Sequence, residues 1–139
     1  MPAIVIHGRE DALVFPNYQS RAYYGLNQAT RGAKSHLSYW EVTPAQHFDT
    51  FISRLWPQPP LTGSVEFVPL HYYLTKALDM MYDHLTSGTP LPPSQVVRAT
   101  ARGTDPLTAA NVPTLMPLPK QNPGADAITF AHGVLNIPE

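Results

Sequence analysis

Apolar and polar stretches along the chain predict strands and helices in turn. Residues 3–7 are a short apolar run rich in β-branched side chains, typical of a strand buried on both faces of a parallel sheet. A turn over residues 8–16 follows, and residues 17–28 predict a helix capped by Asn17. Residues 37–42 predict the next strand. This order favours a parallel crossover, so we expect an α/β fold.

The middle of the chain predicts one long helix among loops. A short helix is expected over residues 48–55, and prolines end it. Four apolar residues then recur at helical spacing between residues 71 and 87, and Gly88 follows where a C-terminal cap belongs. These four residues are Leu74, Leu78, Met81 and Leu85. We therefore expect this helix to pack on another element through the face that carries them.

The last third of the chain predicts short strands between proline-rich loops. Residues 94–98 predict a strand, and residues 106–123 are irregular. The chain has 16 prolines without a repeating pattern, which indicates ordered loops rather than a polyproline ligand. Residues 127–130 and 134–137 predict a β-hairpin around a His-Gly turn.

Composition narrows the possible classes of protein. The 139 residues make one domain or a piece of a larger one, and only 14% of them are charged, against about 25% in a typical soluble domain. Part of the surface is therefore expected to lie against protein. A net charge of -1 with scattered Lys and Arg gives no field for nucleic acid. No apolar stretch reaches the roughly 18 residues of a membrane span, and no signal peptide is recognisable.

Candidate chemistry lies just beyond the two predicted strands. Asp11 follows the first strand and His47 follows the second, so both side chains are expected at the carboxyl edge of the sheet, where open α/β folds place their sites. A carboxylate there can orient an imidazole that takes a proton from a serine. The plainer alternative is a solvated turn aspartate and a packing histidine. His7, Asp11 and His47 form only a loose zinc pattern, so we expect neither a metal nor another cofactor.

Several motifs resemble one family closely. An apolar strand followed by His-Gly-x-x-Asp-x-x-Val, over residues 7–14, resembles the acid-bearing segment of the α/β hydrolases, whose triad runs Ser, Asp, His along the chain. Residues 43–49, 68–71, 77–82 and 91–98 together resemble the C-terminal part of the D-(-)-3-hydroxybutyrate oligomer hydrolases. The resemblance covers nearly the whole chain.

The resemblance implies a fold, a reaction and a location. The chain would be a single partial domain, residues 1–139, from the C-terminal portion of an α/β-hydrolase fold. Residues 1–56 would hold the acid and histidine, and residues 57–139 a helix, a Pro-rich loop and a terminal hairpin. The family splits 3-hydroxybutyrate dimers and oligomers by a serine esterase mechanism and is regarded as extracellular. The residues themselves do not decide between a secreted and a cytoplasmic parent protein.

By position, the resemblance assigns individual roles. Asp11 would be the triad acid and His47 the general base, with Gln46 and Phe48 as the neighbours of the substrate. The nucleophile is missing, because no Gly-x-Ser-x-Gly occurs and none of the seven serines has the setting of a nucleophile elbow. The missing N-terminal part would supply it, and this chain alone is expected to be inactive. The alternative is a binding or interaction module that has kept the fold without catalysis.

Overall fold

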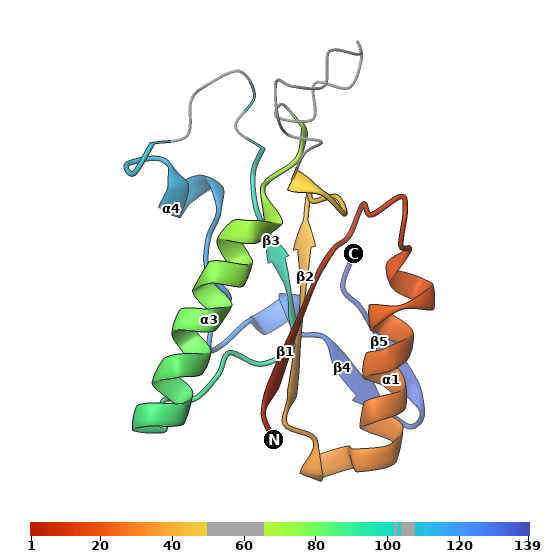
Figure 1. Ribbon diagram of the computed structural model, residues 1–139. Coiled ribbons are helices and arrows are strands. Elements are labelled where there is room, and N and C mark those ends of the chain that lie inside the picture. Colours follow the sequence, from red (N-terminus) through yellow and green to blue (C-terminus); the bar gives the residue numbers. More distant parts are fainter. Residues whose placement is uncertain (50–65, 102, 104–107) are drawn as a thin grey trace.

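A parallel sheet forms the centre of the computed structural model (Figure 1). The structure describes residues 1–49, 66–101, 103 and 108–139. Within these ranges the sheet has the order β1 (Ala3–Gly8), β2 (Leu37–Thr43) and β3 (Gln95–Arg98). Both neighbouring pairs are parallel, with Ala3 opposite Leu37 and Trp40 opposite Gln95. The expected α/β class and the parallel crossover from β1 to β2 are therefore present.

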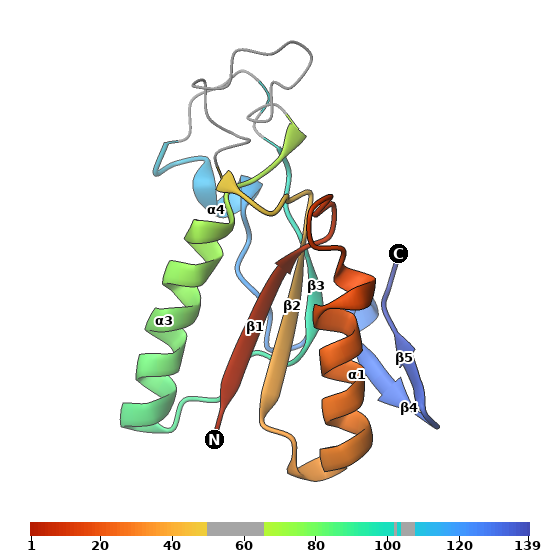
Figure 2. The ribbon, with the colours of Figure 1, turned by 45° about the vertical axis from the view of Figure 1, so that its right-hand side comes forward.

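The two long helices cover opposite faces of this sheet (Figures 1 and 2). Helix α1 (Ser20–Arg31) joins β1 to β2, and α3 (Leu70–Ser87) precedes β3. Successive residues of β2 pack on opposite faces of the sheet, because side chains alternate along a strand. Tyr39 packs with Tyr24 of α1, whereas Trp40 belongs to the cluster that contains Tyr73 of α3.

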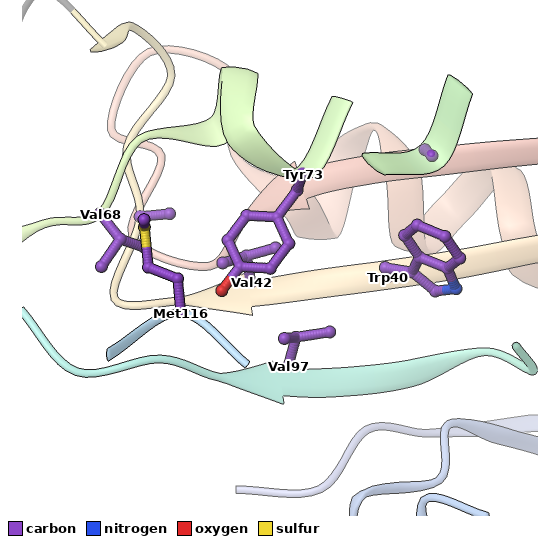
Figure 3. Packing of buried hydrophobic residues seen from close by; sticks show 8 residues of the cluster. Trp40, Val42, Val68, Tyr73, Val97 and Met116 are labelled. Carbon is purple, nitrogen blue, oxygen red and sulfur yellow. The ribbon is translucent and has the colours of Figure 1, made fainter. Parts of the chain in front are cut away.

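The larger apolar cluster lies between the sheet and α3 (Figure 3). Its buried members are Trp40, Val42, Ala45, Val68, Tyr73, Ala77, Val97 and Met116. Trp40 is 0% exposed, so its whole side chain belongs to the core. Burying a large apolar side chain of this kind contributes about 1.5 to 3 kcal/mol. This cluster fixes α3 beside the strands that carry the candidate chemistry.

The terminal hairpin forms as predicted. Strands β4 (Thr129–Ala131) and β5 (Val134–Asn136) pair antiparallel. The residues between them, His132 and Gly133, have φ values of 52° and 79°, as a tight hairpin turn requires. Leu135 packs on the cluster around Tyr24, so the hairpin lies against the α1 side. The segment expected to be irregular contains one short helix, α4 (Val112–Leu115).

The predicted start of the first helix is wrong by three residues. Pro16 begins a separate 3₁₀ turn, η1 (Pro16–Tyr18), and α1 starts only at Ser20, with Gln19 as its cap. Asn17 does not cap the helix, because its Oδ1 accepts a hydrogen bond from Arg21 instead. Proline pre-sets the backbone for a tight turn, and this local preference prevails over the capping signal. A second 3₁₀ turn, η2 (Gly32–Lys34), follows α1.

The face of α3 that packs on the sheet is not the one that carries the four apolar residues at helical spacing. Tyr73 and Ala77 are the buried residues of the helix, whereas Leu74, Leu78 and Leu85 are more than half exposed. The helix has apolar residues on two neighbouring faces, and helical spacing alone does not say which one meets the sheet. The predicted cap is confirmed, since Gly88 has a φ of 74° and donates its N–H to the His84 carbonyl.

The remaining helices and turns are short or lie partly outside the described residues. The short helix expected over residues 48–55 falls almost wholly outside the described residues. Among the helices that the structure describes, none has the length and apolar character to cross a membrane. A last 3₁₀ turn, η4 (Gly124–Asp126), leads into the hairpin.

Candidate active site

The carboxyl ends of β1 and β2 bring the predicted acid and histidine together. Asp11 lies three residues beyond β1, and His47 lies four residues beyond β2. Because the strands are parallel neighbours, both loops emerge at the same edge of the sheet. The Nδ1 atom of His47 is 2.7 Å from Oδ2 of Asp11. The geometry is that of an oriented acid–base pair, while the catalytic role of the two residues stays a prediction.

Asp11 is held as a buried, hydrogen-bonded carboxylate. Its Oδ1 accepts the backbone N–H groups of Leu13 at 2.9 Å and Val14 at 2.8 Å, and its side chain is 2% exposed. Burial alone would raise the pKa of Asp11, but hydrogen bonds from the Val14 backbone, His47 and the Leu13 backbone outweigh it and lower the pKa below 3.8. Asp11 is therefore charged at neutral pH.

His47 presents its second nitrogen away from the carboxylate. Since an ionised carboxylate only accepts hydrogen bonds, Nδ1 of His47 carries the proton and Nε2 has the free lone pair. The side chain is 32% exposed, so part of the imidazole is open to solvent or to another polypeptide. The ring of Phe48 packs edge-on against the imidazole at a centroid distance of 4.4 Å. This orientation is the one that a general base requires.

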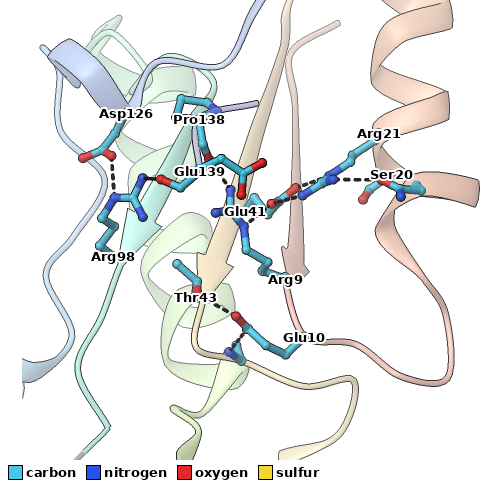
Figure 4. A network of polar contacts seen from close by, with 12 residues as sticks. Arg9, Glu10, Ser20, Arg21, Glu41, Thr43, Arg98, Asp126, Pro138 and Glu139 are labelled. Carbon is cyan, nitrogen blue, oxygen red and sulfur yellow. Dashed lines mark hydrogen bonds and ion pairs between the residues drawn. The ribbon is translucent and has the colours of Figure 1, made fainter. Parts of the chain in front are cut away.

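Hydrogen bonds join the loop of the acid to the loop of the histidine (Figure 4). The carboxylate of Glu10 accepts the Thr43 hydroxyl at 2.7 Å and the Ala45 N–H at 2.8 Å. The backbone N–H of Glu10 donates to the Ala45 carbonyl at 3.1 Å. At Gly8, an added Cβ would lie 2.4 Å from that same carbonyl oxygen, so only glycine allows this approach. The two loops are therefore fixed relative to each other.

A buried carboxylate anchors the same end of β1 from the α1 side. Glu41 on β2 is 0% exposed and accepts Arg9 at 2.5 Å, Arg21 of α1 at 2.5 Å and the Tyr39 hydroxyl at 2.7 Å (Figure 4). Burial alone would raise its pKa, but the hydrogen bonds from Arg21, Tyr39 and Arg9 outweigh this and lower the pKa below 4.5. Arg9 also donates to the carbonyl of Pro138. This network holds Arg9, two residues before Asp11, in place.

The two residues predicted to contact substrate lie in different surroundings. Gln46 accepts the Ala12 N–H at 3.2 Å, so its side chain connects the two loops. Phe48 is 49% exposed and lines a hollow of about 400 Å³. That hollow is bordered by Ile4, Ile6, His47, Phe48, Asp49, Leu70, His71 and Leu74. Substrate binding by Gln46 and Phe48 stays a prediction, and the position of Phe48 suits it better.

Asp49 and His71 meet beside the hollow. The Asp49 carboxylate accepts the backbone N–H groups of Leu70 at 2.7 Å and His71 at 2.9 Å, at the beginning of α3. It also bonds the Nδ1 atom of His71. Asp49 thus places a negative charge at the N-terminal end of α3, 21 residues later in the chain, which stabilises the helix start.

Sequence reasoning missed two residues of this site. Glu10 and His7 stand within four residues of Asp11, yet nothing in the local pattern distinguishes Glu10 from a solvated turn residue. His7 is largely buried, and its Nε2 atom lies 2.8 Å from the Val14 carbonyl oxygen. Its second partner is Asp11, at 3.1 Å. The His-x-x-x-Asp spacing was the signal that could have placed it in the site.

No serine of the described part is hydrogen-bonded to His47, whose partner there is Asp11. Ser20 lies on the α1 side, bonded to Tyr39, and Ser94 receives the Tyr39 N–H. In the described ranges, no group of three or more His, Asp and Glu residues is arranged to hold a metal ion.

Fold and site together define an α/β protein with a histidine–aspartate pair of the kind used for proton transfer, at the carboxyl edge of a parallel sheet. A family model described as 3HB-oligomer hydrolase matches residues 1–139, so the chain belongs to this family. Similar proteins from Paraburkholderia xenovorans and Burkholderia mallei are named D-(-)-3-hydroxybutyrate oligomer hydrolase.

The two relatives are 49% and 48% identical to the chain over 143 residues. Each match covers 99% of this chain but only 19% of the relative, so the chain spans about a fifth of the relatives' length. No solved structure matches the chain. These comparisons do not bear on the compartment, so the extracellular location stays a prediction.

Proposed function

We propose that this chain is the C-terminal, acid–base segment of a serine esterase of the α/β-hydrolase fold that hydrolyses 3-hydroxybutyrate dimers and oligomers. The observation that carries the proposal is the 2.7 Å hydrogen bond between buried Asp11 and the Nδ1 atom of partly exposed His47. Membership of the family and the names of its relatives support the substrate class. Asp11 is the triad acid and His47 the general base.

In the proposed reaction, a serine from the remaining part of the protein attacks the ester carbonyl. Nε2 of His47 takes the serine proton, and Asp11 stabilises the imidazolium that forms. The C–O bond to the departing hydroxybutyrate unit then breaks, and His47 returns the proton to that oxygen. Water then attacks the acyl-enzyme and gives its proton to His47. The bond to the serine oxygen breaks, His47 returns the proton to that oxygen, and the free acid is released. This chain supplies both proton-transfer residues but no nucleophile.

The surface beside β1 supports the presence of a further part of the sheet. In the described residues, β1 pairs with β2 on one edge only. Parallel strands are normally buried on both faces, and open edges with apolar surroundings are typical of sites where more chain packs. The hollow beside Ile4 and Ile6 continues onto α3 through Leu74. An exposed apolar face follows along the helix, formed by Leu74, Leu78, Tyr82 and Leu85, each 55% to 69% exposed.

We therefore place the nucleophile-bearing part of the protein on this side. About four-fifths of each relative's sequence lies outside the part that this chain matches, which is ample for the missing strands. The low charge content of the chain fits a surface of which part is covered by protein. With that part absent, the chain alone should not turn over esters.

The test measures hydrolysis of the linear 3-hydroxybutyrate dimer by two proteins. One is the 139-residue chain, and the other is this chain joined to the upstream sequence of the Paraburkholderia relative. We expect activity only in the longer protein, reduced by at least about 10³-fold in His47→Ala. His36→Ala is the matched control, because His36 is exposed at the opposite end of β2 and should leave the rate unchanged.

Activity of the short chain that survives the loss of His47 would overturn the assignment of the acid–base pair. Absence of activity in both proteins, with the longer one folded, would favour the second class, a binding module without catalysis. That outcome would be followed by a binding measurement with 3-hydroxybutyrate.

A further inference from the structure

A second imidazole contacts the carboxylate of Asp11. Nε2 of His7 lies 3.1 Å from Oδ2 of Asp11, the same oxygen that His47 approaches at 2.7 Å. Nε2 of His7 is also 2.8 Å from the carbonyl oxygen of Val14. A carbonyl and an ionised carboxylate can only accept hydrogen bonds, so this nitrogen of His7 carries a proton and donates to both.

His7 belongs to the strand, whereas its two partners belong to the loop. It is the last residue but one of β1, and its side chain is only 11% exposed. Its two hydrogen bonds reach both ends of the turn from Asp11 to Val14. Since loops move more than strands, a contact of this kind transfers the rigidity of the sheet to the carboxylate.

Each oxygen of the Asp11 carboxylate already has two hydrogen-bond partners. Oδ1 of Asp11 accepts two backbone N–H groups, and Oδ2 is shared by the two imidazoles. If the donor on His7 is removed, the backbone bonds hold Oδ1 but leave Oδ2 with His47 alone. The carboxyl group can then rotate about its own axis, and the line between Oδ2 and Nδ1 of His47 is no longer fixed from two sides.

We propose that His7 is a positioning residue for the acid–base pair: through its Nε2 proton it holds Oδ2 of Asp11 in place for Nδ1 of His47. This inference rests on the proposed function for its catalytic meaning. Its structural content, that the hydrogen bond between His47 and Asp11 depends on His7, can be tested without any substrate.

The test compares His7→Gln with His7→Asn in the 139-residue chain. Both side chains end in an amide, but only glutamine places its nitrogen about where Nε2 of histidine lies. The readout is the NMR signal of the His47 Nδ1 proton and its rate of exchange with water. We expect the signal in the unmodified chain and in His7→Gln, and its loss through faster exchange in His7→Asn. A His7 that only packs predicts equal signals in the two variants, and that result would overturn the proposal.

The second readout is kinetic and uses the longer protein. We expect His7→Asn to lower kcat about 10- to 100-fold with little change in KM, because a small misplacement of a catalytic group has effects of this size. His7→Gln should restore most of the rate. If the longer protein is inactive even without substitution, the proposed function fails, and the NMR comparison still decides the role of His7. Equal kcat values in the two variants would contradict the proposal.

Discussion

At Gly8, the missing side chain allows two loops of the site to meet. An added Cβ would lie 2.4 Å from the Ala45 carbonyl oxygen and 2.7 Å from its carbon, and both are backbone atoms that cannot turn aside. The backbone of Glu10 donates to that same carbonyl. Gly8 thus sets the spacing between the segment of Asp11 and that of His47.

We expect Gly8→Ala to destabilise the chain by about 2 to 3 kcal/mol, because the Ala45 backbone must move. It should also lower the activity of the longer protein, since the loop of His47 moves with it. The measurement is urea unfolding of the 139-residue chain together with dimer hydrolysis. Gly25→Ala is the matched control: its nearest neighbour would be 3.9 Å away, and alanine favours the helix by about 0.5 to 1 kcal/mol. Equal effects of both substitutions would contradict this reading.

Between elements, the buried carboxylate of Glu41 ties β2 to the end of β1 and to α1. Its partners Arg9 and Arg21 are 32 and 20 residues away in the sequence. The lowered pKa of Glu41 means that its charged form is favoured by folding. Its contribution to stability is therefore complete above its ordinary pKa of 4.5 and is lost as the pH falls through the lower folded value.

We expect Glu41→Gln to lower the free energy of unfolding at pH 7 by about 2 to 4 kcal/mol, since it removes one partner of a buried ion pair. The difference from the unmodified chain should narrow below pH 4.5, as Glu41 itself becomes protonated. Denaturant unfolding at pH 7 and at lower pH measures both effects. Glu66→Gln, at an exposed position, should change little at either pH. A difference that stays constant with pH would contradict the role of the charge.

The elements themselves were largely predictable from the sequence. The strands at residues 3–7 and 37–42, the long helix with Gly88 and the hairpin follow from local periodicity and turn residues, and all are observed. The errors arose where two local signals competed, as at Asn17 beside Pro16, or where a helix is apolar on two faces.

The contacts around the candidate site were less predictable. The sequence could place Asp11 and His47 at one edge, because parallel strands deliver their loops there. It could not pair Glu10 with Ala45, Asp49 with the start of α3, or Glu41 with two arginines. Such partners are chosen by three-dimensional packing between positions 20 to 35 residues apart, and no periodicity encodes them.

On the scale of the whole molecule, one side of the structure is unusually apolar. On this side lie the hollow beside Ile4 and Ile6, the exposed face of α3, and the edge of β1 that has no strand partner among the described residues. Exposed apolar surface of this extent marks a place where other protein packs. The 139-residue chain by itself should therefore self-associate.

We expect Leu78→Ser to reduce self-association of the 139-residue chain, measured by light scattering, because Leu78 is 64% exposed on the apolar face of α3. In the longer protein the same change should lower the free energy of unfolding by about 2 kcal/mol, since there the leucine is buried. Asp83→Ser, on an exposed polar position of the same helix, is the matched control and should have neither effect. An unaffected longer protein would show that this face stays uncovered.

The unit β1–α1–β2 with its two following loops contains the hydrogen-bond partners of the Asp11 and His47 side chains in the described structure, namely each other, His7, Leu13 and Val14. Fewer than fifty consecutive residues therefore contain the contacts that set the geometry of the pair. A stretch of this kind can pass between related genes in a single recombination event with the hydrogen bond between Asp11 and His47 intact. Under the proposed function, the nucleophile-bearing part would then be free to diverge in its choice of ester while the same pair is kept.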